Sequence, residues 1–335
     1  MTLKNTIIIK IRLRNIKILI IVDDYFPSNK PAATMMHQLA KEFISNDNQV
    51  SILTPSSHIS NQTEIEEIEG VEVLRFKSGR IKNVSRTIRA INESMLSIRA
   101  WYSLKTFFNV NKHDFIIYYS PSIFFGPLVW KLKRIWGAKS FLILRDIFPR
   151  WAIDNNLMSE YSPITLYFKF FEKINYLNAN TIGLMSEKNL EFFNKSYKVN
   201  NKKIVLHNWI SRFKVKKSKN NYRKQFDLEK KVVFFYGGNI GKAQDILAIV
   251  KLAEKMKNIN NAHFFIVGDG ESFNEIISEI NILKLNNITL LKTVKREEYY
   301  DMLNQFDIGI FSLSKLHQTH NFPGKILEYL NFNKP

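Results

Sequence analysis

The sequence predicts an α/β protein with two doubly wound domains, and two observations carry this prediction. Short apolar runs rich in Ile, Val and Phe alternate along the chain with segments of helical periodicity. The alternation stops at one strongly basic stretch and then restarts. The length of 335 residues suits two domains of about 150 residues each.

The first domain is predicted over residues 16–210. Continuous apolar runs are typical of parallel strands that are buried on both faces, because such strands show no polar alternation. By this criterion the expected strands are 17–22, 49–54, 71–76, 115–119, 140–144 and 181–185. Residues 1–15 precede the first strand and are interpreted as a short basic extension.

The second domain is predicted over residues 231–335, after a basic linker at 211–230. The linker is inferred because residues 212–224 contain seven Lys or Arg and no acid. The expected strands of the second domain are 231–236, 263–267, 288–291 and 307–312. Two such Rossmann-like halves predict a cleft at the carboxyl ends of their strands, where open α/β sheets bind ligands.

Composition excludes several kinds of chemistry. The chain has no cysteine, which excludes disulfides, thiolate zinc sites and a Cys nucleophile and fits a cytoplasmic protein. It has no apolar run of 18 residues or more, so no membrane-spanning helix is expected. The net charge of +19 indicates an anionic partner, or else a Lys-rich composition bias of equal weight. No nucleic-acid-binding motif is present, so nucleic acid is not expected as a partner.

Residues 80–112 show apolar residues every three or four positions, with seven basic residues against the single acid Glu93. A basic amphipathic helix of this kind can lie on an anionic membrane surface. An ordinary covering helix with a solvated basic face is the alternative.

Two glycine-rich segments of the second domain follow predicted strands. Glycines there allow a backbone to approach a ligand closely, and a helix N-terminus nearby favours phosphate. The spacing matches neither the dinucleotide fingerprint nor a P-loop, and tight turns would need the same glycines. The candidate donor-binding residues of the two segments are Gly238, Asn239, Gly241, Lys242, Gly268 and Gly270.

The segment HQTHNFPGKILE, residues 317–328, places Lys325 and Glu328 three positions apart on a helix that Pro323 can start. Lysine can neutralise a diphosphate, and a carboxylate can accept hydrogen bonds from two ribose hydroxyls. An exposed ion pair within the helix is the alternative. His320 lies next to this lysine and is a further candidate.

In the first domain, Arg145 and Asp146 follow a predicted strand, where catalytic groups gather in these folds. Asp146 could accept a proton or orient a sugar hydroxyl, and Arg145 and Arg150 could hold phosphate. A structural Arg–Asp pair is equally compatible. Asp23 and Asp24 resemble half of a metal site, but no further carboxylate cluster accompanies them, so no metal is expected.

Taken in order, the motifs resemble the family 4 glycosyltransferases, in particular the N-acetyl-L-fucosamine transferases of O-antigen and capsule assembly. The resemblance extends from Lys17 onward. The matching segments are IVDDYFP, MMHQLAKEF, VLRFKSG, YYSPSIFFGPLVWKLK, LILRDIFPRW, FFYGGNIGKAQD, FIVGDGE, FSLSK and THNFPGKILEYLNFNKP.

The resemblance implies a GT-B fold, with an acceptor-binding first domain and a second domain that binds a nucleotide-sugar without metal. It assigns Glu328 to the donor ribose, Gly238 and Asn239 to the diphosphate loop, Lys325 to the family's P-[SG]-K-x-x-E pattern and Asp146 to the sugar. This chain departs from the family at two places. It has His320 where many members carry a glutamate, and it has Ala32 and Ala33 where members often carry paired glycines.

Relatives continue for several dozen residues beyond Asn333-Lys334-Pro335, so the second domain is expected to be incomplete and less stable than an extended chain. The expected function is transfer of an amino-deoxyhexose from a UDP carrier to a polyprenyl-diphosphate-linked acceptor at the inner membrane face. The alternative is a truncated, inactive remnant that binds a membrane or a partner without catalysis.

Overall fold

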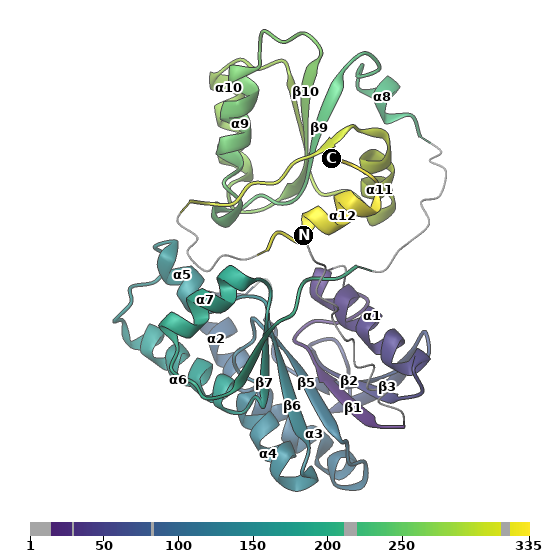
Figure 1. Cartoon of the computed structure of the whole chain (residues 1–335), viewed down its shortest axis with the longest axis vertical. Coiled ribbons are helices and arrows are strands. Elements are labelled where there is room, and N and C mark those ends of the chain that lie inside the picture. Colours follow the sequence, from purple (N-terminus) through teal and green to yellow (C-terminus); the bar gives the residue numbers. More distant parts are fainter. Residues whose placement is uncertain (1–14, 29, 82–83, 211–219, 316–321) are drawn as a thin grey trace, which may run out of the picture. The chain divides into compact units, whose positions relative to one another are not determined.

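The computed structural model describes residues 15–28, 30–81, 84–210, 220–315 and 322–335. The chain forms two compact units, each an α/β fold with a mainly parallel sheet, which confirms the predicted fold class (Figure 1). Unit 1 comprises Met1–Pro149 and Pro163–Leu206, and unit 2 comprises Arg150–Ser162 and His207–Pro335.

Unit 1 contains the strands β1 (Lys17–Ile21), β2 (Gln49–Ser56), β3 (Thr63–Ile68), β4 (Val71–Lys77), β5 (Phe115–Ser120), β6 (Lys139–Leu144), β7 (Thr181–Leu184) and β8 (Lys202–Val205). They form one sheet in the order β3-β4-β2-β1-β5-β6-β7-β8. Every neighbouring pair is parallel except β3 and β4. All six strands predicted for this part of the chain are present, and β3 and β8 are additional.

The helices of unit 1 are α1 (Pro31–Ser45), α2 (Arg86–Ser94), α3 (Leu96–Val110), α4 (Gly126–Trp136), α6 (Pro163–Leu177) and α7 (Glu187–Ser196). Local chemistry sets several of their ends. Proline stands at the start of α1, and the Ser186 side chain caps α7 by accepting from the Asn189 amide. Gly137 ends α4 in the left-handed conformation, at φ 70°.

The core of unit 1 lies on both faces of the sheet. Leu19 and Ile21 of β1 belong to a buried cluster with residues of α3, α4 and α7. Side chains alternate along a strand, so Ile18 and Ile20 face the opposite side. Helix α1 packs against β2 and β4 without joining that cluster, and it therefore covers the opposite face. This is the doubly wound arrangement that the continuous apolar runs predict.

The segment 80–112, predicted as one membrane-binding helix, is two helices in the structure. The break lies at Met95, between α2 and α3. Helix α3 contributes Leu104 and Phe108 to the core, whereas its Ile98, Tyr102 and Val110 are exposed. In α2, the large apolar residues Ile88 and Ile91 are also exposed. The prediction of one continuous helix was wrong. The membrane contact of this segment stays a prediction, since the apolar residues at its helical spacing, Ile88, Ile91, Ile98 and Tyr102, are exposed.

Unit 2 contains the strands β9 (Val232–Asn239), β10 (Ala262–Asp269), β11 (Ile288–Leu291) and β12 (Ile308–Gly309), all parallel in the order β11-β10-β9-β12. Its helices are α5 (Arg150–Asp154), α8 (Tyr222–Gln225), α9 (Ile246–Lys255), α10 (Phe273–Ile282), α11 (Arg296–Gln305) and α12 (Lys325–Asn331). Helices α9 and α10 cover one face, and α8, α11 and α12 cover the other.

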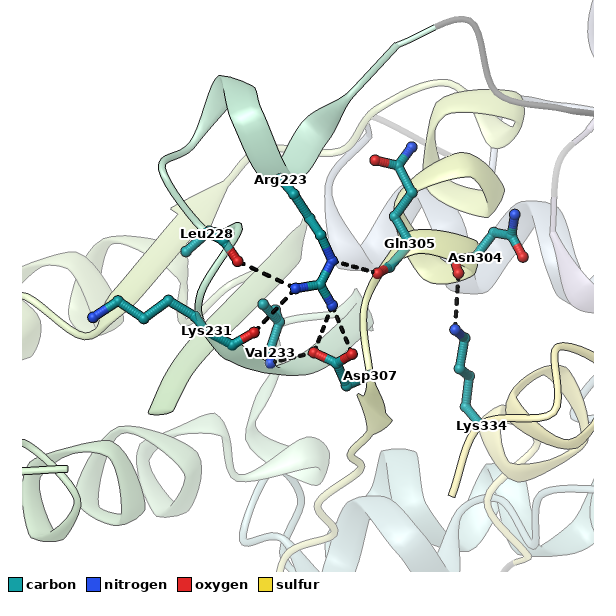
Figure 2. Close-up of polar contacts among 8 residues, drawn as sticks. All are labelled: Arg223, Leu228, Lys231, Val233, Asn304, Gln305, Asp307 and Lys334. Atoms are coloured by element: carbon teal, nitrogen blue, oxygen red, sulfur yellow. Dashed lines mark hydrogen bonds and ion pairs between the residues drawn. The ribbon is translucent and has the colours of Figure 1, made fainter. Parts of the chain in front are cut away.

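Residues 220–230, which the sequence places in a basic linker, carry a structural arginine of unit 2. Arg223 donates to both carboxylate oxygens of Asp307 at 2.6 Å and to the carbonyls of Leu228, Lys231 and Gln305 (Figure 2). Asp307 also accepts from the Val233 amide at 2.8 Å. The network anchors the start of this segment to the sheet. Residues 150–162, which the sequence places in the first domain, group with unit 2.

Candidate active site

The carboxyl ends of β9 and β10 form the floor of the candidate site in unit 2. The two strands stay paired to their ends, with Gly238 opposite Gly268 and Asn239 opposite Asp269. Residues 237–239, expected to be a turn, therefore extend strand β9. The Ile240 amide then donates to the Asp269 carbonyl at 2.8 Å, and this bond closes the two loops against each other.

Glycine is required where these backbones meet. A Cβ on residue 268 would lie 1.8 Å from the Gly238 carbonyl oxygen, and one on residue 270 would lie 2.4 Å from the Ile240 carbonyl oxygen. Both neighbours are backbone atoms, which cannot move aside as a flexible side chain would. The sequence analysis expects the backbone at Gly268 to approach a ligand closely. In the structure this backbone approaches Gly238 closely.

A triad of polar side chains stands beside this floor. The Tyr299 hydroxyl of α11 donates to Glu328 Oε2 of α12 at 2.8 Å. Lys325 Nζ lies 3.1 Å from the same oxygen and 3.4 Å from the Tyr299 hydroxyl. It also lies 4.9 Å from the centre of the Tyr299 ring, a cation–π distance. The ion pair within α12 that the sequence analysis left as an alternative is therefore present.

The two glycines of β9 join this triad to the floor of the site. A Cβ on residue 237 would lie 2.1 Å from the Tyr299 ring, and one on residue 238 would lie 3.0 Å from Lys325 Cε. Gly238, Lys325 and Glu328, proposed from sequence as parts of one pocket, thus lie together at the end of β9. Their predicted roles toward a ligand stay predictions.

Tyr299 stays protonated and so remains a donor to Glu328. Burial is the main cause that raises the Tyr299 pKa well above its usual value, and the negative charge of Glu328 adds to it. The site therefore combines one cation, glycine backbone and a carboxylate held by a phenol. Such a set can bind an anionic group beside a group that carries hydroxyls.

The remaining candidates of unit 2 lie in the loop after β9 and around α12. The Asn239 side chain donates to Gln244 Oε1 at 2.7 Å, and the Lys242 amide contacts Glu271 Oε1 at 3.4 Å. A Cβ on residue 241 would lie 2.7 Å from Asn239 Nδ2. Pro323 precedes α12, while His320 lies outside the described residues.

Acidic and phenolic groups gather at the carboxyl edge of the sheet in unit 1. Asp146 follows β6 and is half-buried, and its carbonyl accepts from Ser120 Oγ at 3.3 Å. Burial raises the pKa of Asp23, after β1, to about 6, although the charge of Lys30 opposes the shift. Burial likewise raises the pKa of Tyr119, with smaller contributions from Asp146 and Asp23. The three elements β1, β5 and β6 are neighbours in the sheet.

The two arginines proposed as phosphate ligands make internal contacts. Arg145 is 4% exposed, and its guanidinium donates to the Leu206 carbonyl at 2.7 Å. Burial lowers its pKa to about 10. Arg150 forms an ion pair with Asp154 one turn further along α5, at 2.7 Å. These contacts favour a structural role for both arginines, and a catalytic role of Arg145 remains a prediction.

The described residues include no group of three or more His, Cys, Asp or Glu that could hold a metal ion. Asp24 instead contacts Lys30 at 3.1 Å and accepts from Ser28 Oγ at 2.8 Å. The same part of the chain has no helix that is both long and apolar enough to cross a membrane.

Two residues that sequence reasoning overlooked stand out in the structure. Tyr299 shares helical spacing with Met302, Leu303 and Phe306, which are all buried, and this signal predicts that its ring points inward. Asp23 was considered only as half of a metal pair. Its position directly after a buried parallel strand is the signal that marks it as a candidate polar group of a site.

Solved structures with this fold cover most of the chain. They include an Escherichia coli protein described as trehalose-6-phosphate bound with UDP-2-fluoro glucose, at 10% identity and a TM-score of 0.65, with 94% of this chain and 81% of that one covered. Anabaena HepE in complex with UDP and glucose has 12% identity and a TM-score of 0.64, with 96% and 80% covered. WaaG, a glycosyltransferase involved in lipopolysaccharide biosynthesis, has 12% identity and a TM-score of 0.62, with 95% and 80% covered.

The fold is thus GT-B, as the resemblance implied. Residues 218–335 match the model of the family described as glycosyl transferases group 1. The class of protein that this fold and this matched segment define is a glycosyltransferase, an enzyme. Apart from Arg150, the matched segment includes all the described candidate residues of unit 2. No curated protein matches the chain.

Proposed function

We propose that this chain transfers a sugar from a nucleoside diphosphate to a lipid-linked glycan acceptor. The observation that carries the proposal is the joint position of Gly238, Lys325, Tyr299 and Glu328 in the segment that the glycosyltransferase model matches. Solved structures of the same fold contain UDP or a UDP-sugar, which supports a UDP carrier for this chain.

The reaction breaks the bond between the sugar C1 and the diphosphate oxygen, which keeps the electron pair. An acceptor hydroxyl forms the new bond to C1 and gives up its proton. Charge accumulates on the leaving diphosphate, so the main catalytic contribution is its neutralisation by Lys325. Asp146 is assigned to a sugar hydroxyl or to the released proton. No metal is assigned to this reaction.

Glu328 is assigned to the ribose of the donor. Among the described residues, the two that contact its side chain, Tyr299 and Lys325, both contact Oε2. The carboxylate is therefore already oriented before the nucleotide binds, which lowers the entropy cost of binding. Its other oxygen, Oε1, is the one that we assign to a ribose hydroxyl.

The finer parts of the proposal follow from the sequence resemblance. The sugar is N-acetyl-L-fucosamine or a similar amino-deoxyhexose, and the acceptor is a polyprenyl-diphosphate-linked glycan of O-antigen or capsule assembly. The enzyme would then work in the cytoplasm at the inner face of the plasma membrane. The net charge of +19 supports an anionic membrane as a partner.

Calorimetric titration with UDP, GDP and ADP, together with a transfer assay, tests the proposal. UDP is expected to bind most tightly, and Glu328→Ala is expected to weaken UDP binding about 10- to 100-fold because a charged hydrogen-bond partner is lost. Lys325→Met is expected to lower the transfer rate about 100-fold. The exposed Lys257 provides the matched control Lys257→Met.

Unchanged UDP affinity in Glu328→Ala would remove the donor-site assignment. A wild-type chain that neither binds a nucleotide nor hydrolyses a donor, yet still binds vesicles, would support the alternative of a non-catalytic membrane-binding protein.

A further inference from the structure

The outward side of helix α6 in unit 1 is apolar. Surface helices usually present polar residues to solvent. The exposed residues of α6 are Pro163, Ile164, Leu166, Tyr167, Phe170, Lys173 and Leu177, of which only the lysine is charged. Leu166 and Phe170 are 54% and 59% exposed, and their spacing of four places them in one stripe of the helix.

The inner side of α6 is firmly seated, so the apolar stripe belongs to a well-packed helix. Phe171 packs on Phe124 with ring centres 5.1 Å apart. Lys133 of α4 donates to the Asn178 carbonyl just after α6, at 2.8 Å. At the start of α4, Gly126 packs closely on α6, since a Cβ on this residue would lie 2.8 Å from Asn175 Cα.

Trp130 of α4 extends the apolar stripe. Gly126, Trp130 and Lys133 follow one another at spacings of four and three, so they lie on one side of α4. Gly126 and Lys133 both contact the C-terminal end of α6, so the half-exposed Trp130 stands on the side of α4 that is turned toward α6. The Arg134 guanidinium stands 4.9 Å from the centre of that ring.

The charges on these two helices are positive at the surface. Their basic residues are Lys131, Lys133, Arg134, Lys169 and Lys173. Their only acid, Glu172, is 4% exposed and accepts from the Tyr176 hydroxyl at 2.9 Å. An apolar aromatic stripe with a cationic rim complements the surface of an anionic bilayer, where rings enter the headgroup region and cations meet phosphates.

We propose that this α4–α6 face, made of the apolar stripe of α6, Trp130 and the basic residues of both helices, binds an anionic lipid membrane. The proposal deepens the proposed function and rests on it, because a lipid-linked acceptor is reached at a membrane surface. A second copy of the chain is a poorer occupant, since two copies joined at this face would bring two cationic rims together.

Flotation of the full chain with vesicles tests the proposal. The vesicles contain phosphatidylethanolamine with about one third phosphatidylglycerol, and pure phosphatidylcholine vesicles serve as the neutral comparison. The double variant Leu166→Ser/Phe170→Ser is expected to bind the anionic vesicles at least about ten-fold more weakly than wild type, because it removes the two most exposed large apolar side chains in the centre of the stripe. Wild type is expected to bind the neutral vesicles at least about ten-fold more weakly than the anionic ones.

Two single variants are matched controls. Ile282→Ser removes a 73% exposed isoleucine from α10 of unit 2, and Ile91→Ser removes a 58% exposed one from α2, in the segment that the sequence indicated for membrane contact. Both are expected to bind anionic vesicles within about two-fold of wild type. Loss of binding in Ile91→Ser with full binding in the double variant would overturn the proposal in favour of α2.

UDP binding by the same samples separates the two proposals. The double variant is expected to keep wild-type UDP affinity, which also shows that it is folded. Vesicle binding without UDP binding in wild type would refute the proposed function and leave the membrane face standing. A wild-type dimer that dissociates in the double variant, with no vesicle binding, would identify the face as a protein interface and overturn the inference.

Discussion

The carboxyl edges of the two sheets share one architecture and present opposite chemistry. In unit 1 the strand ends carry side chains, among them Asp23, Tyr119 and Asp146. In unit 2 the ends of β9 and β10 carry Gly238 and Gly268, and the polar side chains beside them belong to the helices α11 and α12. One edge is acidic and partly desolvated, while the other offers backbone and a cation.

The difference agrees with the proposed function, in which the two units bind different ligands. Bare backbone and lysine suit a diphosphate, which needs close approach and positive charge. Carboxyl and phenol groups suit sugar hydroxyls, which both donate and accept hydrogen bonds. Under the proposed function, the glycines of unit 2 and the acidic residues of unit 1 would each match the ligand of their own unit.

The largest expected effect would break the glycine-built edge. Gly268→Ala places a Cβ against the Gly238 carbonyl oxygen, so the two strands must separate, and we expect the free energy of unfolding to fall by about 3 kcal/mol or more. Urea denaturation measures it. Gly324→Ala is the control, since its Cβ would meet only Asn208 Nδ2 at 3.9 Å and should cost less than about 1 kcal/mol. Equal losses in the two variants would contradict the argument.

A smaller effect is expected at the acidic edge of unit 1, where the burial of Asp23 can be tested. Burial raises the pKa of Asp23 to about 6, so the native state favours its protonated form more than the unfolded chain does. The stability that this carboxyl contributes is present below about pH 4 and is lost as the pH rises through about 6. We expect Asp23→Asn to exceed wild type in unfolding free energy by about 1–2 kcal/mol at about pH 7.5, with a much smaller gap near pH 4.

Urea denaturation at the two pH values measures this gap, with Glu275→Gln as the control for removal of one negative charge. A gap that is the same at both pH values would show that Asp23 does not titrate as its burial requires.

The smallest effect concerns the triad of unit 2. Tyr299→Phe keeps the ring against Gly237 and removes only the hydroxyl that donates to Glu328, so we expect UDP affinity to fall about three- to ten-fold with folding preserved. Calorimetry measures it. Tyr300→Phe is the matched control, because the Tyr300 hydroxyl contacts the exposed Arg296 at 3.0 Å. If Tyr300→Phe lowers UDP affinity as much as Tyr299→Phe does, the hydrogen bond from Tyr299 to Glu328 has no specific role in UDP binding.

The sequence predicts the fold well where burial makes strands continuously apolar. Strand β3 escaped notice because its sequence TEIEEI is half glutamate, as suits an exposed edge strand paired on one side only. Strand β8 has only four residues, two of them lysines. In both cases the strand lies at a sheet edge and contains charged residues, so it does not form the apolar run by which the other strands were predicted.

The candidate site was partly predictable for a similar reason. Gly238, Lys325 and Glu328 belong to local motifs, and the structure brings them together. Tyr299 reaches Glu328 from 29 positions away, a contact that depends on how α11 and α12 pack. Arg145 shows the opposite case, since its place after a strand suggested a ligand contact while its guanidinium in fact donates to the backbone of Leu206.

The network around Arg223 also bears on how unit 2 folds during its synthesis. The guanidinium meets the carbonyls of Leu228 and Lys231 within a few residues, but its remaining partners, Gln305 and Asp307, are 82 and 84 positions later. On a ribosome the arginine therefore emerges long before the carboxylate that neutralises it. The nascent unit can therefore complete this hydrogen-bond network only after synthesis has passed Asp307.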